Sequence, residues 1–275
     1  MTGPDHAVAA PALPLRPFVS HYAGSRMHDA PPLEHAGLPS RHLDLIVSLA
    51  RPIEIIRMPG AQPPGAYQAF VAGLQQAPAV VRMGGHLDCL HVFLKPAAAR
   101  ALLGVSGREI ASRVVNLADI DRAMCDEFVE TLIAADSWRE RFAAVDRILL
   151  RRLRPIMMPD ALAWSWRSLA VSHGRVAVHE LAREIGFSRR HLTERFTCEF
   201  GIAPKVAGRV FRFEHACRLF MRAPSRIVDV AMASGFHDQA HMVREWHALA
   251  GCAPREWVRG QLPFLQDYEI GGGHD

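Results

Sequence analysis

The chain has 275 residues, of which 49% are hydrophobic and 22% are charged, and its formal net charge is +4. This length and composition fit a globular protein of one large or two small domains. The sequence has no run of about eighteen uncharged apolar residues, which excludes a membrane-spanning helix. We also expect no secretory signal, because the first residues lack a basic segment followed by an apolar one. The mildly basic balance permits a nucleic-acid partner but does not require one.

The first half of the sequence predicts a β-rich region that gives way to helices. Apolar residues alternate over 43–49, as in a half-buried strand, and residues 53–57 predict a second strand. Gly84-Gly85 lies between two apolar runs and predicts a hairpin turn. Beyond Pro96 the apolar residues recur at three- and four-residue spacing, which predicts helices over 96–103, 117–135 and 137–153.

The second half predicts an almost entirely helical region. Residues 151–159 hold a basic cluster and two prolines, which is typical of a linker. Asp160 is expected to cap the first helix. The helices are expected over 160–171, 178–186, 189–200, 204–221, 227–234 and 238–249. We therefore predict an α+β fold, with a β-rich, barrel-like N-terminal domain carrying helices over 1–155, an all-α domain over 156–260 and a flexible tail over 261–275.

Two segments of the all-α region share one design. Each has a short helix, a Gly-Phe turn, a small polar residue and a second helix, around Gly186-Phe187-Ser188 and around Gly235-Phe236-His237-Asp238. Glycine frees the backbone for the turn. Ser188 and Asp238 are placed to cap the second helices by accepting their free N–H groups. This is the pattern of a helix-turn-helix, and two copies in tandem are far more specific than one.

The helix between the two modules has a length that suits duplex DNA. About eighteen residues at 1.5 Å per residue span roughly 27 Å. Successive major grooves on one face of B-DNA lie about 34–36 Å apart. A rigid helix of this length can place two modules in adjacent major grooves, so that one chain reads a site without palindromic symmetry.

With these features, the sequence resembles the AraC/XylS family of bacterial transcription regulators over about residues 165–259. The resemblance rests on residues of both modules and of the helix between them: Leu181-Ala182, Gly186-Phe187-Ser188, His191-Leu192, Phe196, Gly201, Arg212, Glu214-His215-Ala216, Ile227, Ala231, Gly235-Phe236, Asp238-Gln239, Arg244, Gly251 and Pro254-Arg255-Glu256-Trp257. Met242 and Trp246 stand where the family usually has Phe. Both are apolar substitutions at core positions, and they leave the fold prediction unchanged.

The resemblance implies that the second helix of each module enters the major groove. Carried over by position, Arg190, Thr193 and Glu194 face base edges from the first module. Gln239, Ala240, His241 and Arg244 do so from the second. The side-chain chemistry agrees, since Arg suits guanine, Gln suits adenine, Glu accepts from cytosine and Ala can touch a thymine methyl. Arg189 and Arg195 flank the first recognition helix and are expected on phosphates.

Several of these residues also have plainer interpretations. Arg189-Arg190 can be a solvated helix start, and Glu194 can pair within its own module. Arg212 is expected to be structural, and Lys205 and Arg209 can contact phosphates or pair with Glu214 or Glu256. His191 is expected to pack or cap locally. The aromatic residues on apolar stripes are expected in the core and not as stacking platforms: Phe196, Phe200, Phe213 and Trp246.

Little in the sequence predicts catalysis or a cofactor. The five cysteines are scattered, which predicts reduced thiols in a cytoplasmic protein and not a zinc or disulfide framework: Cys89, Cys125, Cys198, Cys217 and Cys252. His42, His86 and His91 lie near Asp44 and Asp88 along the chain, but single surface histidines are favoured over a metal site. Nucleophile-elbow, phosphate-loop and dinucleotide motifs are absent from the sequence. We therefore expect no enzyme, no cofactor and no metal.

The sequence thus predicts a sequence-specific transcription regulator, and activation is the family's commoner outcome. Residues 156–260 carry 15 basic and 10 acidic residues and are expected to bind double-stranded DNA. Residues 1–155 are expected to sense a small-molecule effector or to mediate self-association as a homodimer. RNA polymerase is the expected further partner, and no membrane is expected. Two alternatives stay open, namely a purely dimerising first domain without effector and an enzyme-like first domain that is targeted to DNA.

Overall fold

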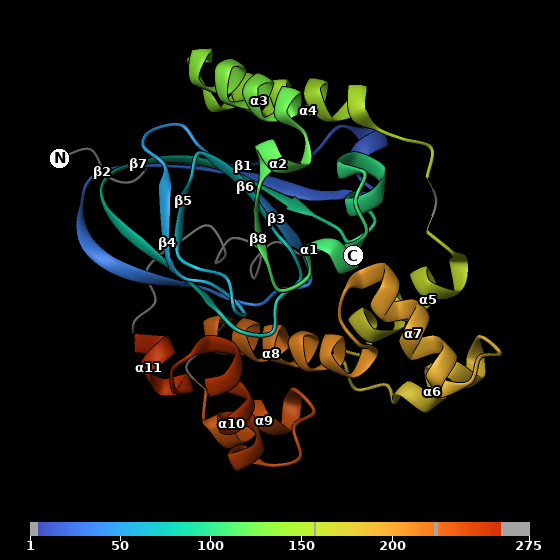
Figure 1. The fold of residues 1–275 in the computed structure, drawn as a ribbon. Helices are drawn as coiled ribbons and strands as arrows, with labels where there is room; N and C mark the ends of the chain where they lie inside the picture. Colours follow the sequence, from blue (N-terminus) through green and yellow to red (C-terminus); the bar gives the residue numbers. More distant parts are fainter. Residues whose placement is uncertain (1–4, 157, 223–224, 260–275) are drawn as a thin grey trace.

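The computed structural model describes residues 5–156, 158–222 and 225–259 of the chain. The predicted tail over 261–275 lies outside the described residues. Figure 1 shows two helices, α3 and α4, on one side of a β-sheet, and a long helix, α8, on the opposite side. The other C-terminal helices gather at the two ends of α8. Together with the antiparallel strand pairs, this arrangement is the predicted α+β fold, with a β-rich N-terminal part and an all-α C-terminal part.

The sheet is built around one long central strand. Its eight strands are β1 (Asp5–Ala9), β2 (Val19–Gly37), β3 (Leu43–Ser48), β4 (Ile53–Arg57), β5 (Gly65–Tyr67), β6 (Ala69–Ala72), β7 (Ala79–Leu94) and β8 (Val114–Asn116). The strand order is β1-β2-β7-β3-β6-β8, and β4 pairs with β5 and β7. The strands predicted from alternation over 43–49 and over 53–57 are both present, as β3 and β4.

The hairpin predicted at Gly84-Gly85 is wrong, because β7 continues through the two glycines. β2 pairs with β7 on both sides of them, and Gly85 lies opposite Ala30. The register shifts between Met27 and Ala30 and again before Leu33. Irregularities of this kind bend a strand locally without ending it. The glycines therefore accommodate a bend in two long paired strands and not a chain reversal.

The helices of the first half cover one face of the sheet. The alternate residues of β3 face them, since Leu43, Leu45 and Val47 share one apolar cluster with Phe128 and Val145. The helix predicted over 117–135 is divided into α2 (Leu117–Ile120) and α3 (Arg122–Ala134), because Asp121 ends the first and caps the second. The helix predicted over 137–153 is present as α4 (Trp138–Arg152), and Ser137 caps it. The predicted helix over 96–103 is reduced to a π-helical turn, Ala99–Leu103, and α1 (Gly107–Ile110) follows it.

The second half is helical, as predicted. Its helices are α5 (Asp160–Val171), α6 (Val178–Glu184), α7 (Arg189–Phe200), α8 (Pro204–Arg222), α9 (Ile227–Ala233), α10 (Gln239–Ala250) and α11 (Pro254–Arg259). Two local expectations are wrong. Asp160 is the first residue of α5 and makes no side-chain cap, because Pro159 occupies the capping position. The linker is also shorter than 151–159, since α4 continues to Arg152, which is anchored to Glu127 at 2.8 Å.

The apolar interior is continuous from the sheet into the first part of the helical region. The largest buried cluster contains Phe128 of α3, Phe196 and Phe200 of α7 and Phe211 of α8. A separate cluster surrounds Trp246 of α10. Helix α8 contributes to both clusters and so connects them. Among the described residues, no helix has the length and apolar character that crossing a membrane requires.

Candidate nucleic-acid interface

The first helix-turn-helix module consists of α6 and α7, which a tight turn joins. Gly186 has a φ of +70°, the left-handed conformation that glycine adopts at low cost. Ser188 caps α7, because its hydroxyl accepts a hydrogen bond from the His191 N–H at 3.1 Å. The rings of Phe187 and His191 pack edge to face with centroids 4.5 Å apart. His191 therefore has the local packing role that the sequence predicted.

The residues predicted to contact DNA from the first module are the cap of α7 and residues of its first two turns. Five are exposed: Ser188, Arg189, Arg190, Glu194 and Arg195. Thr193 is half-buried, and its hydroxyl donates to the Arg189 carbonyl at 2.8 Å. The Arg190 Nε donates to Glu194 Oε1 at 2.8 Å, so the ion pair considered for Glu194 forms. Both side chains of this pair are largely exposed, and such a pair constrains them weakly.

The second module, α9 and α10, repeats the plan with a charged cap. Gly235 has a φ of +77° in the turn. The Asp238 carboxylate accepts a hydrogen bond from the His241 N–H at 2.6 Å at the start of α10. This backbone hydrogen bond, and then the His237 side chain, hold the pKa of Asp238 below its ordinary value. Asp238, Gln239, Ala240 and Arg244 are exposed and His241 is half-buried.

Helix α8 holds the two modules at its two ends (Figure 1). Its 19 residues correspond to about 28 Å at 1.5 Å per residue, close to the predicted length. The Arg212 Nη1 donates to the Gly174 carbonyl at 2.5 Å, which confirms its structural role. Of the alternatives considered for Arg209, the structure shows an internal ion pair, but its partner is Glu245 of α10 and not Glu214 or Glu256.

The N-terminal part contacts this helical region through polar pairs that the sequence did not reveal. The Arg41 backbone N–H and Nε both donate to the Glu214 carboxylate of α8, each at 2.6 Å. The Arg41 guanidinium also lies over the Phe211 ring, 4.9 Å from its centroid. Arg100 pairs with Glu199 of α7 at 3.1 Å. The partners are 99 and 173 residues apart in sequence, so no local pattern could have paired them.

The histidines of the first half were expected from the sequence to lie at the surface. This expectation is wrong for His91. His91 is buried, with its Nε2 3.0 Å from Asp44 Oδ1 and its ring stacked on Phe93. Burial, with the neighbouring His42 and His91, lowers the pKa of His21 to about 3. Among the described residues, no group of three or more His, Cys, Asp or Glu side chains has the arrangement of a metal site. The contacts of His91 with Asp44 and Phe93 lie where β7 pairs with β3.

Asp88 and Cys89, which were also named from the sequence, are buried in the first half. Asp88 is buried and accepts hydrogen bonds from Arg26 at 2.9 Å and from Arg141 at 3.1 Å. Cys89 beside it is buried, and this burial raises the pKa of its thiol to about 12. A neutral, enclosed thiol of this kind is a poor nucleophile.

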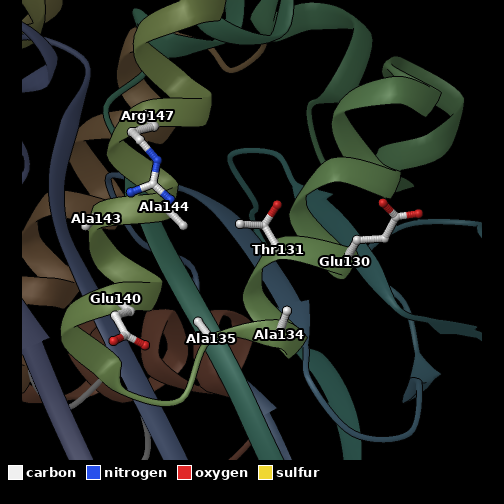
Figure 2. Close-up of a pocket in the computed structure, with 8 residues that line it drawn as sticks. All are labelled: Glu130, Thr131, Ala134, Ala135, Glu140, Ala143, Ala144 and Arg147. Carbon is white, nitrogen blue, oxygen red and sulfur yellow. The ribbon is translucent and has the colours of Figure 1, made fainter.

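A groove opens on the outer side of the N-terminal part, between α3 and α4 (Figure 2). Its volume is about 500 Å³, within the range of small-molecule sites. It is lined by Glu130, Thr131, Ala134, Ala135, Glu140, Ala143, Ala144 and Arg147. Figure 2 shows the alanines between the two helices and the charged side chains toward the edges.

Comparison with known proteins agrees with this architecture. A family described as a helix-turn-helix domain matches residues 181–260, and a domain of unknown function, DUF6597, matches residues 7–116. The crystal structure of ToxT from Vibrio cholerae O395 superimposes with a TM-score of 0.50 at 12% identity, over 93% of this chain and 97% of that one. A second ToxT structure gives a TM-score of 0.51 at 12% identity, over 94% and 99%.

Two curated relatives match the helical region. The chain is 30% identical over 77 residues to the virulence regulon transcriptional activator VirF of Yersinia enterocolitica, which is 28% of each chain. It is 26% identical over 103 residues to an uncharacterized HTH-type transcriptional regulator of Staphylococcus aureus, which is 38% of this chain but 14% of that protein. The chain thus spans well under a third of these relatives. With both modules in place and these matches, residues 181–260 form a helix-turn-helix domain similar to those of the AraC/XylS family of transcription regulators.

Proposed function

We propose that the chain is a sequence-specific transcription regulator that binds double-stranded DNA through both helix-turn-helix modules. The observation that carries this proposal is the pair of exposed polar helix starts, those of α7 and α10, at the two ends of α8. The second helix of such a motif reads base edges in the major groove from its N-terminal residues. The all-α DNA-binding domain of this proposal comprises residues 156–260.

Each of the residues at these two helix starts has a distinct proposed role. Arg190, Thr193 and Glu194 read base edges from α7. Gln239, Ala240, His241 and Arg244 read them from α10. Arg189 and Arg195 bind phosphates, while Ser188 and Asp238 hold the two helix starts in place. The net charge of residues 156–260 is only +5, so base contacts contribute more to the affinity than bulk attraction does.

The N-terminal domain, residues 1–155, controls this activity by binding a small-molecule effector. In support, a ToxT structure of similar fold holds (E)-4-(8-methylnaphthalen-1-yl)but-3-enoic acid, an aromatic carboxylic acid. The contacts of Arg41 with Glu214 and of Arg100 with Glu199 give the effector a path to α8 and α7. An effector acts by shifting the balance between arrangements of the two parts. The related VirF is named as an activator, which favours activation through contact with RNA polymerase.

Self-association of the N-terminal domain is a second candidate role. The groove between α3 and α4 has a floor of alanines and both charge signs at its edges, and Ile133 of α3 is 51% exposed beside it. Such a surface can meet its own copy across a two-fold axis. Sedimentation of the purified chain tests this role, and a concentration-independent monomer would remove it.

Genome-wide footprinting with the purified chain tests the proposed function directly, with and without candidate carboxylic acids. The expected result is a set of protected sites covering two adjacent major grooves. In quantitative binding, Arg244→Ala should cost about 1–3 kcal/mol at such a site and relax the preference at one base pair. Arg189→Ala should reduce the salt dependence of binding by about one counterion. Binding to no duplex, or equally to all sequences, would contradict the proposal.

A further inference from the structure

The second module has a groove at its surface. Of the residues that are proposed to read bases, one lines this groove. It has a volume of about 610 Å³ and lies where the end of α8 and the start of α9 meet α11. Its lining is Phe220, Ser225, Arg226, Ile227, Val228, Gln239, Pro254, Arg255, Val258 and Arg259. Gln239, the first residue of α10 and a proposed base reader, lies at its side.

The groove combines an apolar floor with a basic rim. Phe220, Ile227 and Val228 line it, and Val258 of α11 is 42% exposed. The charged residues that line it are three arginines: Arg226, Arg255 and Arg259. Arg226 pairs with Asp229 at 3.0 Å, but this pair is largely exposed and constrains the arginine weakly. The surface therefore suits a segment that carries apolar and acidic side chains together.

The sequence that follows α11 has this composition. Residues 260–275 contain four large apolar side chains close together, Leu262, Phe264, Leu265 and Ile270, and Tyr268 among them. The acidic residues of the same segment are Asp267, Glu269 and Asp275, and it has no Lys or Arg, so its net charge is −3. Apolar and acidic residues thus lie together over 264–270 and alternate over 267–270, which complements the floor and the rim of the groove.

The position of this segment in the chain makes the groove easy to reach. It begins directly after Arg259, which itself lines the groove. The five residues that follow Arg259, up to Phe264, span at most about 18 Å when extended. Because the segment is tethered at the rim, its effective concentration at the groove is on the order of millimolar, and even a weak interaction is populated.

We propose that the acidic C-terminal segment, residues 261–275, docks into this groove and covers Gln239, so that it competes with DNA for the second module. Phe264 and Leu265 occupy the apolar floor, while Asp267 and Glu269 face the arginines of the rim. The docking itself is independent of the proposed function, and only the competition with DNA rests on it. If the segment occupies the groove in roughly half to nine-tenths of the molecules, the apparent DNA affinity is about two- to tenfold weaker than that of the uncovered module.

Hydrogen exchange of the full-length chain tests the docking without DNA. The variant F264S/L265S should exchange the amides of α9 and α11 about two- to tenfold faster than the unchanged chain, because the groove is uncovered. The matched control Q261A/Q266A alters the same segment at polar positions and should leave these rates unchanged. Reversing the rim in R255E/R259E should also speed exchange, and D267K/E269K in the same chain should slow it again. Equal rates in the unchanged chain and F264S/L265S would overturn the docking.

Equilibrium binding to a footprinted duplex then tests the competition. F264S/L265S should bind about two- to tenfold more tightly than the unchanged chain, and Q261A/Q266A should bind equally well. An unchanged affinity in F264S/L265S together with weakened binding in R255E/R259E would assign the arginines to DNA phosphates and overturn the competition. If exchange responds as expected but no variant binds any duplex, the docking stands and the proposed function fails.

Discussion

The two helix-turn-helix modules have the same local plan but different attachments to the rest of the molecule. Each has a glycine turn, a capped recognition helix and a glycine after that helix. The core of the first module is continuous with that of the N-terminal sheet, since Phe196 and Phe128 belong to one apolar cluster. The second module packs around its own Trp246. Similar sequence patterns therefore produce similar modules, while tertiary packing gives them unequal access to the N-terminal part.

The backbone contacts show the same inequality. A Cβ added to Gly201, after α7, would lie 2.4 Å from the Gly107 carbonyl oxygen of α1. A Cβ added to Gly251, after α10, would meet nothing closer than Pro78 Cγ at 3.5 Å. The first module is thus in tight contact with the N-terminal part, whereas the second approaches it at ordinary van der Waals distance. A change in the N-terminal part should reach α7 and α8 before it reaches α10.

The largest expected effect is on the separate core of the second module. Trp246 is fully buried and contacts the rings of Phe213, Phe220 and Trp257 at centroid distances of 4.8, 5.4 and 5.3 Å. Trp246→Ala should cost about 3–5 kcal/mol, because it leaves a large cavity. In calorimetry this variant should show a separate early transition for the second module.

The matched variant in the first module is Phe196→Ala. Phe196 is equally buried but belongs to the shared cluster, so its loss should lower the unfolding temperature of the sheet and the first module together. If Trp246→Ala also shifted the whole chain as a single transition, the two cores would not be energetically separate.

The two glycines after the recognition helices allow a sharper test. Ala at Gly201 and Ala at Gly251 carry the same backbone strain, since both glycines have φ near +75° to +79°. Gly201→Ala should cost about 1–3 kcal/mol more than Gly251→Ala, because only its methyl group collides with α1. Denaturant titrations of the two variants measure this difference. Equal costs would show that α1 shifts to accommodate the added methyl group, so that the contact between α1 and Gly201 is loose.

The pair between Arg41 and Glu214 should contribute less. Both side chains are mostly buried, at 21% and 13% exposure, and Arg41→Ala removes the guanidinium that is hydrogen-bonded to the carboxylate. The expected cost is about 1–3 kcal/mol, as for other hydrogen bonds to charged groups. Arg82→Ala is the control, because the Arg82–Glu54 pair is largely exposed and should contribute at most about 1 kcal/mol. A similar small loss in both variants would argue against a firm attachment at α8.

The smallest expected effect concerns the two helix-capping residues, because Asp238 carries a charge and Ser188 does not. The pKa of Asp238 is lowered by the His241 N–H, so its stabilisation of α10 is complete above the ordinary carboxyl pKa of 3.8. It is lost as the pH falls through the lower pKa of the folded state. Ser188, which caps α7, does not titrate. Amide exchange in α10 should therefore quicken relative to α7 as the pH falls below about 4. Asp238→Ser should abolish this relative change, and persistence of the change would assign it to another carboxylate.

The local patterns predicted the modules well because their signals are short in range. The Gly-Phe turns, the caps at Ser188 and Asp238 and the spacing of apolar residues all act within about one helical turn. Pairs such as Gly84-Gly85 were less informative, since the same glycines serve a turn or a bend. Pairing with the long strand β2 makes the glycines a bend, and no local sequence pattern predicts that pairing.

The residues proposed to read DNA follow from sequence because they occupy fixed positions on a capped helix. Most of them are exposed, which agrees with that pattern. The burial of His91 against Asp44 was missed, because the two residues are 47 positions apart in sequence and meet only where β7 pairs with β3. The same reason hid the contact of Arg41 with Glu214.

The sequence by itself determined that the chain carries two capped helix-turn-helix modules on one long helix, because turns, caps and apolar periodicity are properties of neighbouring residues. Only the tertiary structure decided how unequally the two modules are attached. That inequality arises from packing between α1 and α7 and from a carboxylate of α8 that meets an arginine before β3. Contacts between elements about 100 to 170 residues apart depend on the closure of the whole fold, and no local pattern specifies them.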